Sequence, residues 1–225
     1  MRGARMSSRD RVITALERGM PDRVPVAEMI IDPKVIESIS PGMDYADFID
    51  YTDMDMVTCL TMADSPENIH WVDEEKQIWR DKWGACQQLT HDVISMVVPP
   101  AVVETDEDLE AYIPPDPSKA AVHGYARKLV DRFKGKRAIA VVGEATLAPS
   151  VYIRAGMENL MMDYALRPEL VKKIARIGVD YHVELYRRLL SEGVEVIIIG
   201  DDYAGKSGTF MSPAHFAEYI LPGLT

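Results

Sequence analysis

The most constraining feature of this sequence is a set of short apolar runs that alternate with segments of helical periodicity. The runs lie near Val24, Val57, Ile139 and Ile197 and are apolar on both faces. Strands of this kind belong to parallel sheets that are covered on both sides. The alternation therefore predicts an α/β fold of the (β/α)8 TIM-barrel type. A closed barrel needs eight strands and typically about 250 residues or more, so we expect this 225-residue chain to supply about four strands, the N-terminal half.

Helix signals fill the gaps between these strands. Ser7 or Ser8 can cap a first helix, which Gly19 and Pro21 end. Further helices are predicted at 33–39, 45–51, 118–133 and 168–192, with two shorter pieces broken near Gly156 and a final helix from Ser212 through Tyr219. Helices between buried strands are what a parallel sheet requires.

One stretch does not fit the alternation. Gln77–Leu89 followed by Val93–Val98 reads as an antiparallel hairpin, and two tryptophans add to its β-propensity. We interpret this hairpin, about 77–98, as an excursion from the main fold. The prediction is a single domain over 1–225 that is incomplete at its C-terminus.

The composition indicates which classes of binding partner and which cell compartment to expect. The 36 acidic side chains outnumber the 25 basic ones, which gives a net charge of −11. Such a surface repels a polyanion, so we predict no nucleic-acid partner; the same charge also helps to keep a cytoplasmic enzyme in solution. No window approaches the roughly 18 apolar residues of a membrane helix, and the N-terminus lacks the apolar stretch of a secretory signal. We expect a cytoplasmic protein with no membrane partner.

Carboxylates accompany every predicted strand. Glu28 lies in the first, Asp64 follows the second, Glu144 follows the third, and the pair Asp201 and Asp202 follows the fourth. Active sites of such folds lie at the C-terminal ends of the strands. Acids in these loops also serve as turn formers or helix caps, and for Asp64 the two readings stay open. Adjacent buried carboxylates need a cation, a donor or a shared proton, so the predicted catalytic residues are Asp64, Glu144, Asp201 and Asp202.

Other chemistries find less support in the residues. His123 and His182 lie on predicted helices, where we favour a surface or satisfied role over a catalytic one. No histidine or cysteine has the spacing of zinc ligands. No glycine-rich phosphate loop is present, so no nucleotide cofactor is expected. Cys59 lies in an apolar strand and is interpreted as a core residue.

Four segments resemble one known family. They are SSRDRVITALERGMPDRVPV, GEATLAP, AGMENLMMDYALRPELV and GDDYAGKSGTFMSPAHFAEYILPGL. These are similar to uroporphyrinogen decarboxylase-like proteins, which implies a barrel longer than this chain. The decarboxylases of that family carry an RxxGRY loop and an FSDIL motif, whereas this sequence reads VAEMIIDPKV and VTCLTMADSP there. The arginines that would hold a polycarboxylate porphyrinogen are missing from these positions.

The sequence is more similar to the corrinoid-dependent methyltransferase branch of the family. That resemblance implies transfer of a methyl group between a small-molecule substrate and a corrinoid (cobalamin) on a partner protein. The predicted substrate-binding residues are Glu28, at the first strand, Tyr203, beside Asp202, and Tyr152, which resembles the active-site tyrosine of the decarboxylases. The family's zinc, if it is used, would take ligands beyond Thr225, with none in this chain. A homodimer is a further predicted partnership.

Two alternatives stay open beside methyl transfer. The first is decarboxylation of a porphyrinogen, which would place the protein in porphyrin metabolism. The second is an inactive half-barrel or a subunit that pairs with another half, because an open half-barrel exposes two unpaired sheet edges.

Overall fold

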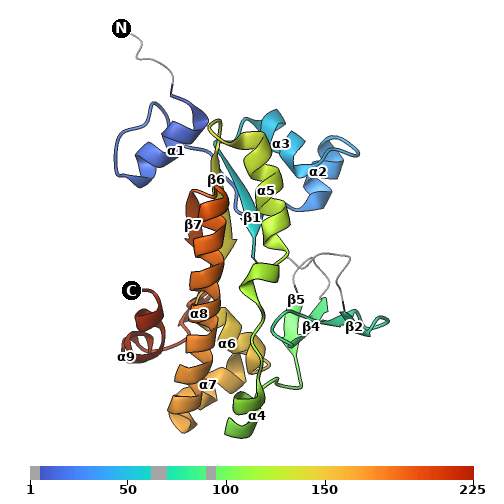
Figure 1. The fold of residues 1–225 in the computed structure, drawn as a ribbon, viewed down its shortest axis with the longest axis vertical. Helices are drawn as coiled ribbons and strands as arrows, with labels where there is room; N and C mark the ends of the chain where they lie inside the picture. Colours follow the sequence, from blue (N-terminus) through green and yellow to red (C-terminus); the bar gives the residue numbers. More distant parts are fainter. Residues whose placement is uncertain (1–5, 62–69, 90–94) are drawn as a thin grey trace. The chain divides into compact units, whose positions relative to one another are not determined.

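The computed structural model describes residues 6–61, 70–89 and 95–225 (Figure 1). The chain divides into two compact units, each assembled from three separate stretches of sequence. Unit 1 comprises Met1–Thr61, Ala121–Val142 and Arg187–Ile198, and unit 2 comprises Met62–Ala120, Gly143–Tyr186 and Ile199–Thr225. Among the described helices, none is both long enough and apolar enough to cross a membrane.

A parallel sheet forms the centre of unit 1. Its three strands are β1 (Met56–Leu60), β6 (Ala138–Gly143) and β7 (Val196–Ile199), in the order β1-β6-β7 (Figure 1). Strands β1 and β6 run parallel, from Met56 opposite Ala138 to Leu60 opposite Val142. Strand β6 is buried along its whole length, as expected for the central strand of a covered sheet. The predicted α/β class and three of the four predicted strands are thereby confirmed.

The fourth predicted strand, near Val24, does not form. Residues 24–31 are mostly exposed and join no sheet. The main chain makes one bond to the edge of β1, from the Asp55 amide to the Val26 carbonyl at 2.7 Å, and the Val26 amide goes to the Asp55 carboxylate instead. Pro25 has no N–H to offer. The prediction was wrong because apolar content alone does not supply the continuous ladder that a strand needs.

The helices of unit 1 follow their sequence signals. They are α1 (Ser8–Leu16), α2 (Pro33–Ile39), α3 (Tyr45–Thr52) and α5 (Val122–Phe133). The Ser7 hydroxyl caps α1 by accepting from the Asp10 amide at 3.0 Å, and Asp32 caps α2. Helix α5 starts later than predicted because Ala120 is extended, which leaves Pro117–Lys119 as a separate 3₁₀ turn.

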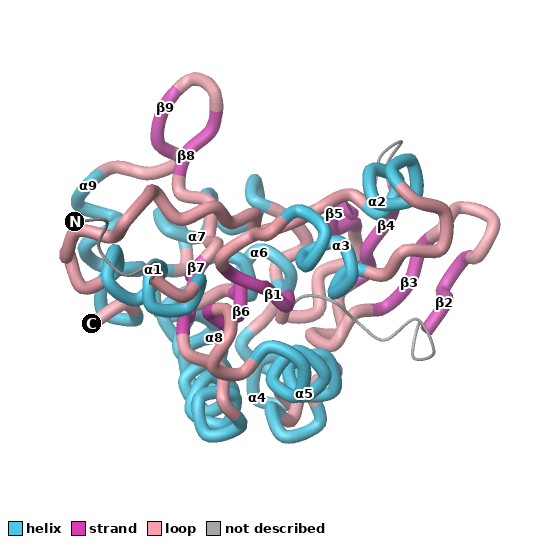
Figure 2. Tube along the Cα trace, turned by 90° about the horizontal axis from the view of Figure 1, so that it is seen from above, coloured by secondary structure: helices cyan, strands magenta, loops and turns pink. Residues whose placement is uncertain are grey.

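Unit 2 begins with the predicted antiparallel excursion. Four strands follow one another in the order β2-β3-β4-β5, namely β2 (His70–Asp73), β3 (Ile78–Arg80), β4 (Cys86–Leu89) and β5 (Ser95–Val98) (Figure 2). The pairing of β3, β4 and β5 confirms the hairpin read from the sequence. Strand β2 was not predicted.

Helices make up most of the rest of unit 2. They are α4 (Asp106–Ala111), α6 (Leu147–Ile153), α7 (Met157–Leu166), α8 (Pro168–Glu192), whose last turns belong to unit 1, and α9 (Pro213–His215). The predicted final helix passes from α9 into a π turn and then a 3₁₀ turn, Phe216–Ile220 and Leu221–Gly223. A two-residue hairpin, β8 (Ala204–Gly205) and β9 (Gly208–Thr209), precedes it (Figure 2).

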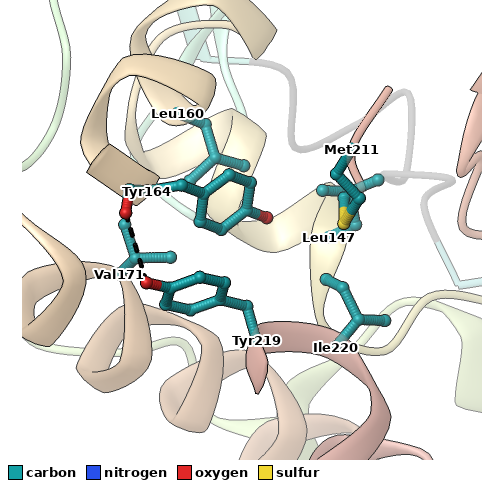
Figure 3. Packing of buried hydrophobic residues seen from close by; sticks show 7 residues of the cluster. All are labelled: Leu147, Leu160, Tyr164, Val171, Met211, Tyr219 and Ile220. Atoms are coloured by element: carbon teal, nitrogen blue, oxygen red, sulfur yellow. Dashed lines mark hydrogen bonds between the residues drawn. The ribbon is translucent and has the colours of Figure 1, made fainter. Parts of the chain in front are cut away.

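An apolar cluster fixes the C-terminal segment within unit 2. The rings of Tyr164 and Tyr219 lie 4.6 Å apart, and the Tyr219 hydroxyl donates to the Tyr164 carbonyl at 3.2 Å (Figure 3). Around them pack Leu147, Leu160, Val171, Met211 and Ile220. Because these residues come from α6, α7, α8 and the C-terminal segment, the cluster ties four parts of the sequence together.

Candidate functional site

A buried glutamate follows the central strand. Glu144 comes directly after β6, which ends at Gly143, and its side chain is 1% exposed. The Tyr152 hydroxyl, from α6, donates a hydrogen bond of 2.5 Å to Glu144 Oε1. Within the described part of the chain, Glu144 Oε2 is buried and has no hydrogen-bond partner. A buried carboxylate oxygen without a donor disfavours the charged form.

Helix α8 contributes the next two residues. The Tyr186 hydroxyl donates to the main-chain carbonyl of Glu144 at 2.6 Å. His182 Nδ1 lies 2.9 Å from the Gly178 carbonyl, and because a carbonyl only accepts, Nδ1 carries the hydrogen. The bare Nε2 then faces Glu144 Oε2 at 4.0 Å, and no described residue gives it a hydrogen bond. We call Glu144, Tyr152, His182 and Tyr186 the Glu144 site.

A glycine allows α8 to approach this loop. A Cβ atom at Gly178 would lie 3.0 Å from the Ala145 carbonyl oxygen and 3.0 Å from Pro149 Cβ. Gly178, His182 and Tyr186 are spaced four apart and share one helix face. The close approach at Gly178 therefore brings His182 and Tyr186 against the loop that follows β6.

Burial governs the protonation of the site. It raises the pKa of Glu144, with Asp201 and Asp81 adding to the rise, while Lys82 and the Tyr152 hydrogen bond oppose it. Burial, together with the charge of Lys82, lowers the pKa of His182 to about 4. Both groups are thus driven toward their neutral forms.

Aromatic rings close one side of the site. Trp83, 1% exposed, packs edge-on against Tyr181 with ring centroids 4.9 Å apart, and its ring centroid lies 5.9 Å from that of His182. The Tyr112 hydroxyl donates a hydrogen bond of 3.0 Å to the Trp83 carbonyl. The Lys82 ammonium lies 5.8 Å from the centre of the Tyr181 ring. These rings keep water away from the imidazole and so support its neutral form.

Asp201 binds main-chain donors at the start of α6. Its carboxylate accepts from the amides of Thr146 at 2.9 Å and Leu147 at 2.8 Å, with longer bonds of 3.3 Å from Ala145 and Ala148. The Thr146 side chain, at the N-cap position, makes no capping bond. Asp201 therefore caps α6 from a distant part of the sequence, which relieves its charge through backbone donors.

The structure brings together four of the predicted site residues. Glu144 and Tyr152 are directly bonded, Asp201 acts on both electrostatically, and the Tyr203 hydroxyl lies 3.4 Å from Asp201 Oδ2. The chemical roles predicted for them remain predictions.

The other predicted residues lie elsewhere. Asp202 is exposed beside the buried Asp201. Glu28 is exposed in unit 1, where its carbonyl accepts from Thr58 at 3.5 Å. Asp64 lies outside the described residues.

Sequence reasoning missed three contributors, namely Lys82, Trp83 and Tyr186, and rated His182 as a surface or satisfied residue. His182 is fully buried and faces the acid. The four-residue spacing of Gly178, His182 and Tyr186 on one helix was a usable signal, since a glycine inside a long helix indicates close packing.

The described side chains do not gather into a metal-binding group. Across residues 6–61, 70–89 and 95–225, no group of three or more His, Cys, Asp or Glu side chains could hold a metal ion. Cys59 is buried in β1, which raises the pKa of its thiol to about 12. The described residues therefore do not form a zinc site.

Comparison with known proteins gives a family and a fold. Residues 88–225 match the family model for uroporphyrinogen decarboxylase (URO-D). Among solved structures, a methyltransferase from Methanosarcina mazei is similar, with a TM-score of 0.67 at 14% sequence identity. The match covers 97% of this chain and 65% of that chain, so this chain spans 65% of its length. Comparison with curated proteins found no match.

Proposed function

The chain belongs to the uroporphyrinogen decarboxylase family, and we propose that its Glu144 site serves methyl transfer between a small substrate and a corrinoid carried by a partner protein. The observation that carries the proposal is the pairing of Glu144. Its partners are a phenol and a neutral imidazole, not a guanidinium. Such a site suits a neutral or cationic substrate.

The nearby cations support this choice of substrate. Arg154 is buried, but its Nε binds Asp163 at 2.5 Å, and Arg167 binds the other oxygen of the same carboxylate at 2.8 Å. Both guanidinium groups are therefore engaged by one shared carboxylate within unit 2. A substrate with several carboxylates needs cationic partners to offset its desolvation. Among the described residues, Lys82 is the cation that acts electrostatically on Glu144, and the acids Asp81 and Asp201 act against it.

The fold is compatible with the same chemistry. The similar solved structure from Methanosarcina mazei is named as a methyltransferase. The aromatic rings of Trp83, Tyr181 and Tyr186 pack around His182 and make its surroundings apolar, as a small methylated molecule would require. The corrinoid would supply the cobalt centre that accepts or donates the methyl group, and this chain's residues would bind and orient the small substrate.

The test is a methyl-transfer assay on the whole natural protein. Reduced cobalamin would be mixed with a panel of methyl ethers, methylamines and methylsulfonium compounds, and the absorbance of methylcobalamin followed. We expect methylcobalamin to form, and Glu144→Gln to alter its rate. The control Glu158→Gln changes an exposed acid on α7 and should leave the rate unchanged.

A parallel assay separates the decarboxylase alternative. The same preparation would be given uroporphyrinogen and its release of carbon dioxide measured. Turnover of uroporphyrinogen, or no methylation of cobalamin by any donor, would overturn the proposal.

A further inference from the structure

Two buried atoms in the Glu144 site face each other without hydrogen bonds. Glu144 Oε2 and His182 Nε2 lie 4.0 Å apart, the two side chains are 1% and 2% exposed, and neither atom has a hydrogen-bond partner among the described residues. Buried polar atoms are normally satisfied, so an opposed, unsatisfied pair calls for a functional explanation. Two acceptors that face each other, a carboxylate oxygen and a bare imidazole nitrogen, leave a negative charge on Glu144 poorly stabilised.

The remaining charged and titratable neighbours come from several elements. They are Tyr152 on α6, Tyr186 and His182 on α8, Asp201 after β7, and Asp81 and Lys82 between β3 and β4. Of these, Tyr152 donates to Glu144 Oε1, and Tyr186 donates to the Glu144 main chain rather than to its carboxylate. The carboxylate thus receives one strong hydrogen bond where a buried charge would need several.

We propose that Glu144 stores a proton and passes it through Tyr152 to the leaving atom of a methyl donor, and that His182 keeps the proton in place by withholding a hydrogen-bond donor from Glu144 Oε2. The inference rests on the proposed methyl transfer and names its substrate class. The donor is a methyl ether or a methylamine, whose oxygen or nitrogen must be protonated in order to leave.

Tyr152 is the exit of this route because it is the partly exposed partner of the buried acid. In the step, the bond between the methyl carbon and its oxygen or nitrogen breaks, and the electron pair stays on that atom. The leaving atom takes the Tyr152 hydroxyl proton, and Tyr152 takes the proton of Glu144. The methyl carbon bonds to the electron pair of the acceptor, a reduced corrinoid. The close contact between the Tyr152 hydroxyl oxygen and Glu144 Oε1, at 2.5 Å, is the path along which the proton would pass.

The proposal is tested by comparing a methyl donor whose leaving atom needs a proton with one whose leaving atom does not. Methoxybenzene needs a proton to leave as a phenol, whereas trimethylsulfonium leaves as a neutral sulfide and needs none. With reduced cobalamin as acceptor, Glu144→Gln in the whole natural protein should slow the ether reaction by about 10²- to 10⁴-fold, the range of general-acid catalysis. The sulfonium reaction should lose far less of its rate, because its leaving group needs no proton.

The outcomes separate the two proposals. If the wild-type protein methylates cobalamin from neither donor, nor from any of the panel above, the proposed function fails and this inference with it. If it uses trimethylsulfonium but no ether or amine, methyl transfer stands and the inference fails. An equal loss with both donors in Glu144→Gln, or no loss with either, also overturns the inference alone.

A pair of variants at His182 tests its positioning role. His182→Gln can donate an N–H to Glu144 Oε2, which stabilises the carboxylate, whereas His182→Leu cannot. The ether rate should fall on the alkaline side, where Glu144 loses its proton, and His182→Gln should move that fall to lower pH. His182→Leu should leave its position unchanged. If both variants only scale the rate equally at every pH, His182 is a packing residue and its part of the proposal is wrong.

Discussion

Asp55 in unit 1 and Glu144 in unit 2 are both buried carboxylates, 0% and 1% exposed, yet their partners are opposite in kind. Asp55 accepts from Arg11 at 2.5 Å, from Arg23 at 2.8 and 3.0 Å, and from the Val26 amide at 2.8 Å. Glu144 accepts from one phenol and leaves its second oxygen unsatisfied.

The difference shows that burial alone does not decide the protonation of an acid. Burial acts to raise the pKa of Asp55, but hydrogen bonds from Val26, Ser8 and Arg11 outweigh it, and the pKa is lowered. At Glu144 burial prevails and the pKa is raised. One acid is held charged and joins elements together, whereas the other is held neutral and has a proton to give.

Removing the charge of Asp55 gives the largest expected effect. Asp55→Asn leaves Arg11 and Arg23 without their shared counter-ion, and breaking a buried pair in this way costs about 3–5 kcal/mol. The free energy of unfolding from urea denaturation measures it. Asp131→Asn, an exposed acid on α5, is the matched control and should change stability by no more than about 0.5 kcal/mol. Equal effects of the two substitutions would erase the contrast between the regions.

The pH dependence of stability tests the neutral histidine. The pKa of His182 falls from 6.5 to about 4 on folding, so between these values the unfolded state binds more protons. Stability from this group is therefore full above pH 6.5 and is lost as pH falls toward 4, by roughly 3 kcal/mol. As pH falls across this window, the unfolding free energy of wild type should fall relative to that of His182→Leu. Parallel curves would contradict a neutral, desolvated imidazole.

Gly178→Ala tests the close approach that assembles the site. The new Cβ meets Ala145 and Pro149 at 3.0 Å, and crowding of this kind costs about 1–3 kcal/mol. The better helix propensity of alanine returns up to about 1 kcal/mol. Gly124→Ala on α5, where a Cβ meets nothing within 4 Å, is the control and should be stabilising. Thermal unfolding should shift in opposite directions, and a shift in the same direction would refute the packing argument.

The smallest effect is expected for Glu144→Gln, the counterpart of Asp55→Asn. Because the folded-state pKa of Glu144 is raised, its contribution to stability is present below the ordinary value of 4.5 and is lost as pH rises through the folded value. The amide is neutral throughout, so below pH 4.5, where Glu144 is protonated in both states, the two proteins should differ by no more than about 1 kcal/mol. The variant should become relatively more stable as pH rises. A large loss at neutral pH would show that Glu144 is charged.

The parts of the fold that were predicted correctly are those that depend on local sequence signals. The caps at Ser7 and Asp32 and the buried strand around Ile139 depend on residues close together in the chain, and each appears where it was expected. The strand predicted near Val24 does not form, because a strand needs a partner whose main-chain amide and carbonyl groups remain available. Asp55 takes the Val26 amide with its side chain, which no local pattern reveals.

The candidate site was also predicted only in part, and the residues that were found are again those with local signals. Glu144 and Asp201 were found because strand ends can be read from hydrophobicity. His182 was rated as a surface or satisfied residue because its surroundings depend on where α8 meets the loop after β6, a contact between residues far apart in sequence. Asp201 was predicted as catalytic, and its ring of backbone donors could not be foreseen, since every loop has amides.

The capping of α6 by Asp201 has a consequence for how such sequences can vary. The donors are chiefly main-chain amides of residues 145–148, which persist whatever side chains replace the native ones. Mutational drift in that loop therefore leaves the contact intact, so long as proline does not enter, whereas position 201 has no such tolerance. Substitutions at residues 145–148 are therefore expected to preserve the contact, whereas a substitution of Asp201 is expected to abolish it.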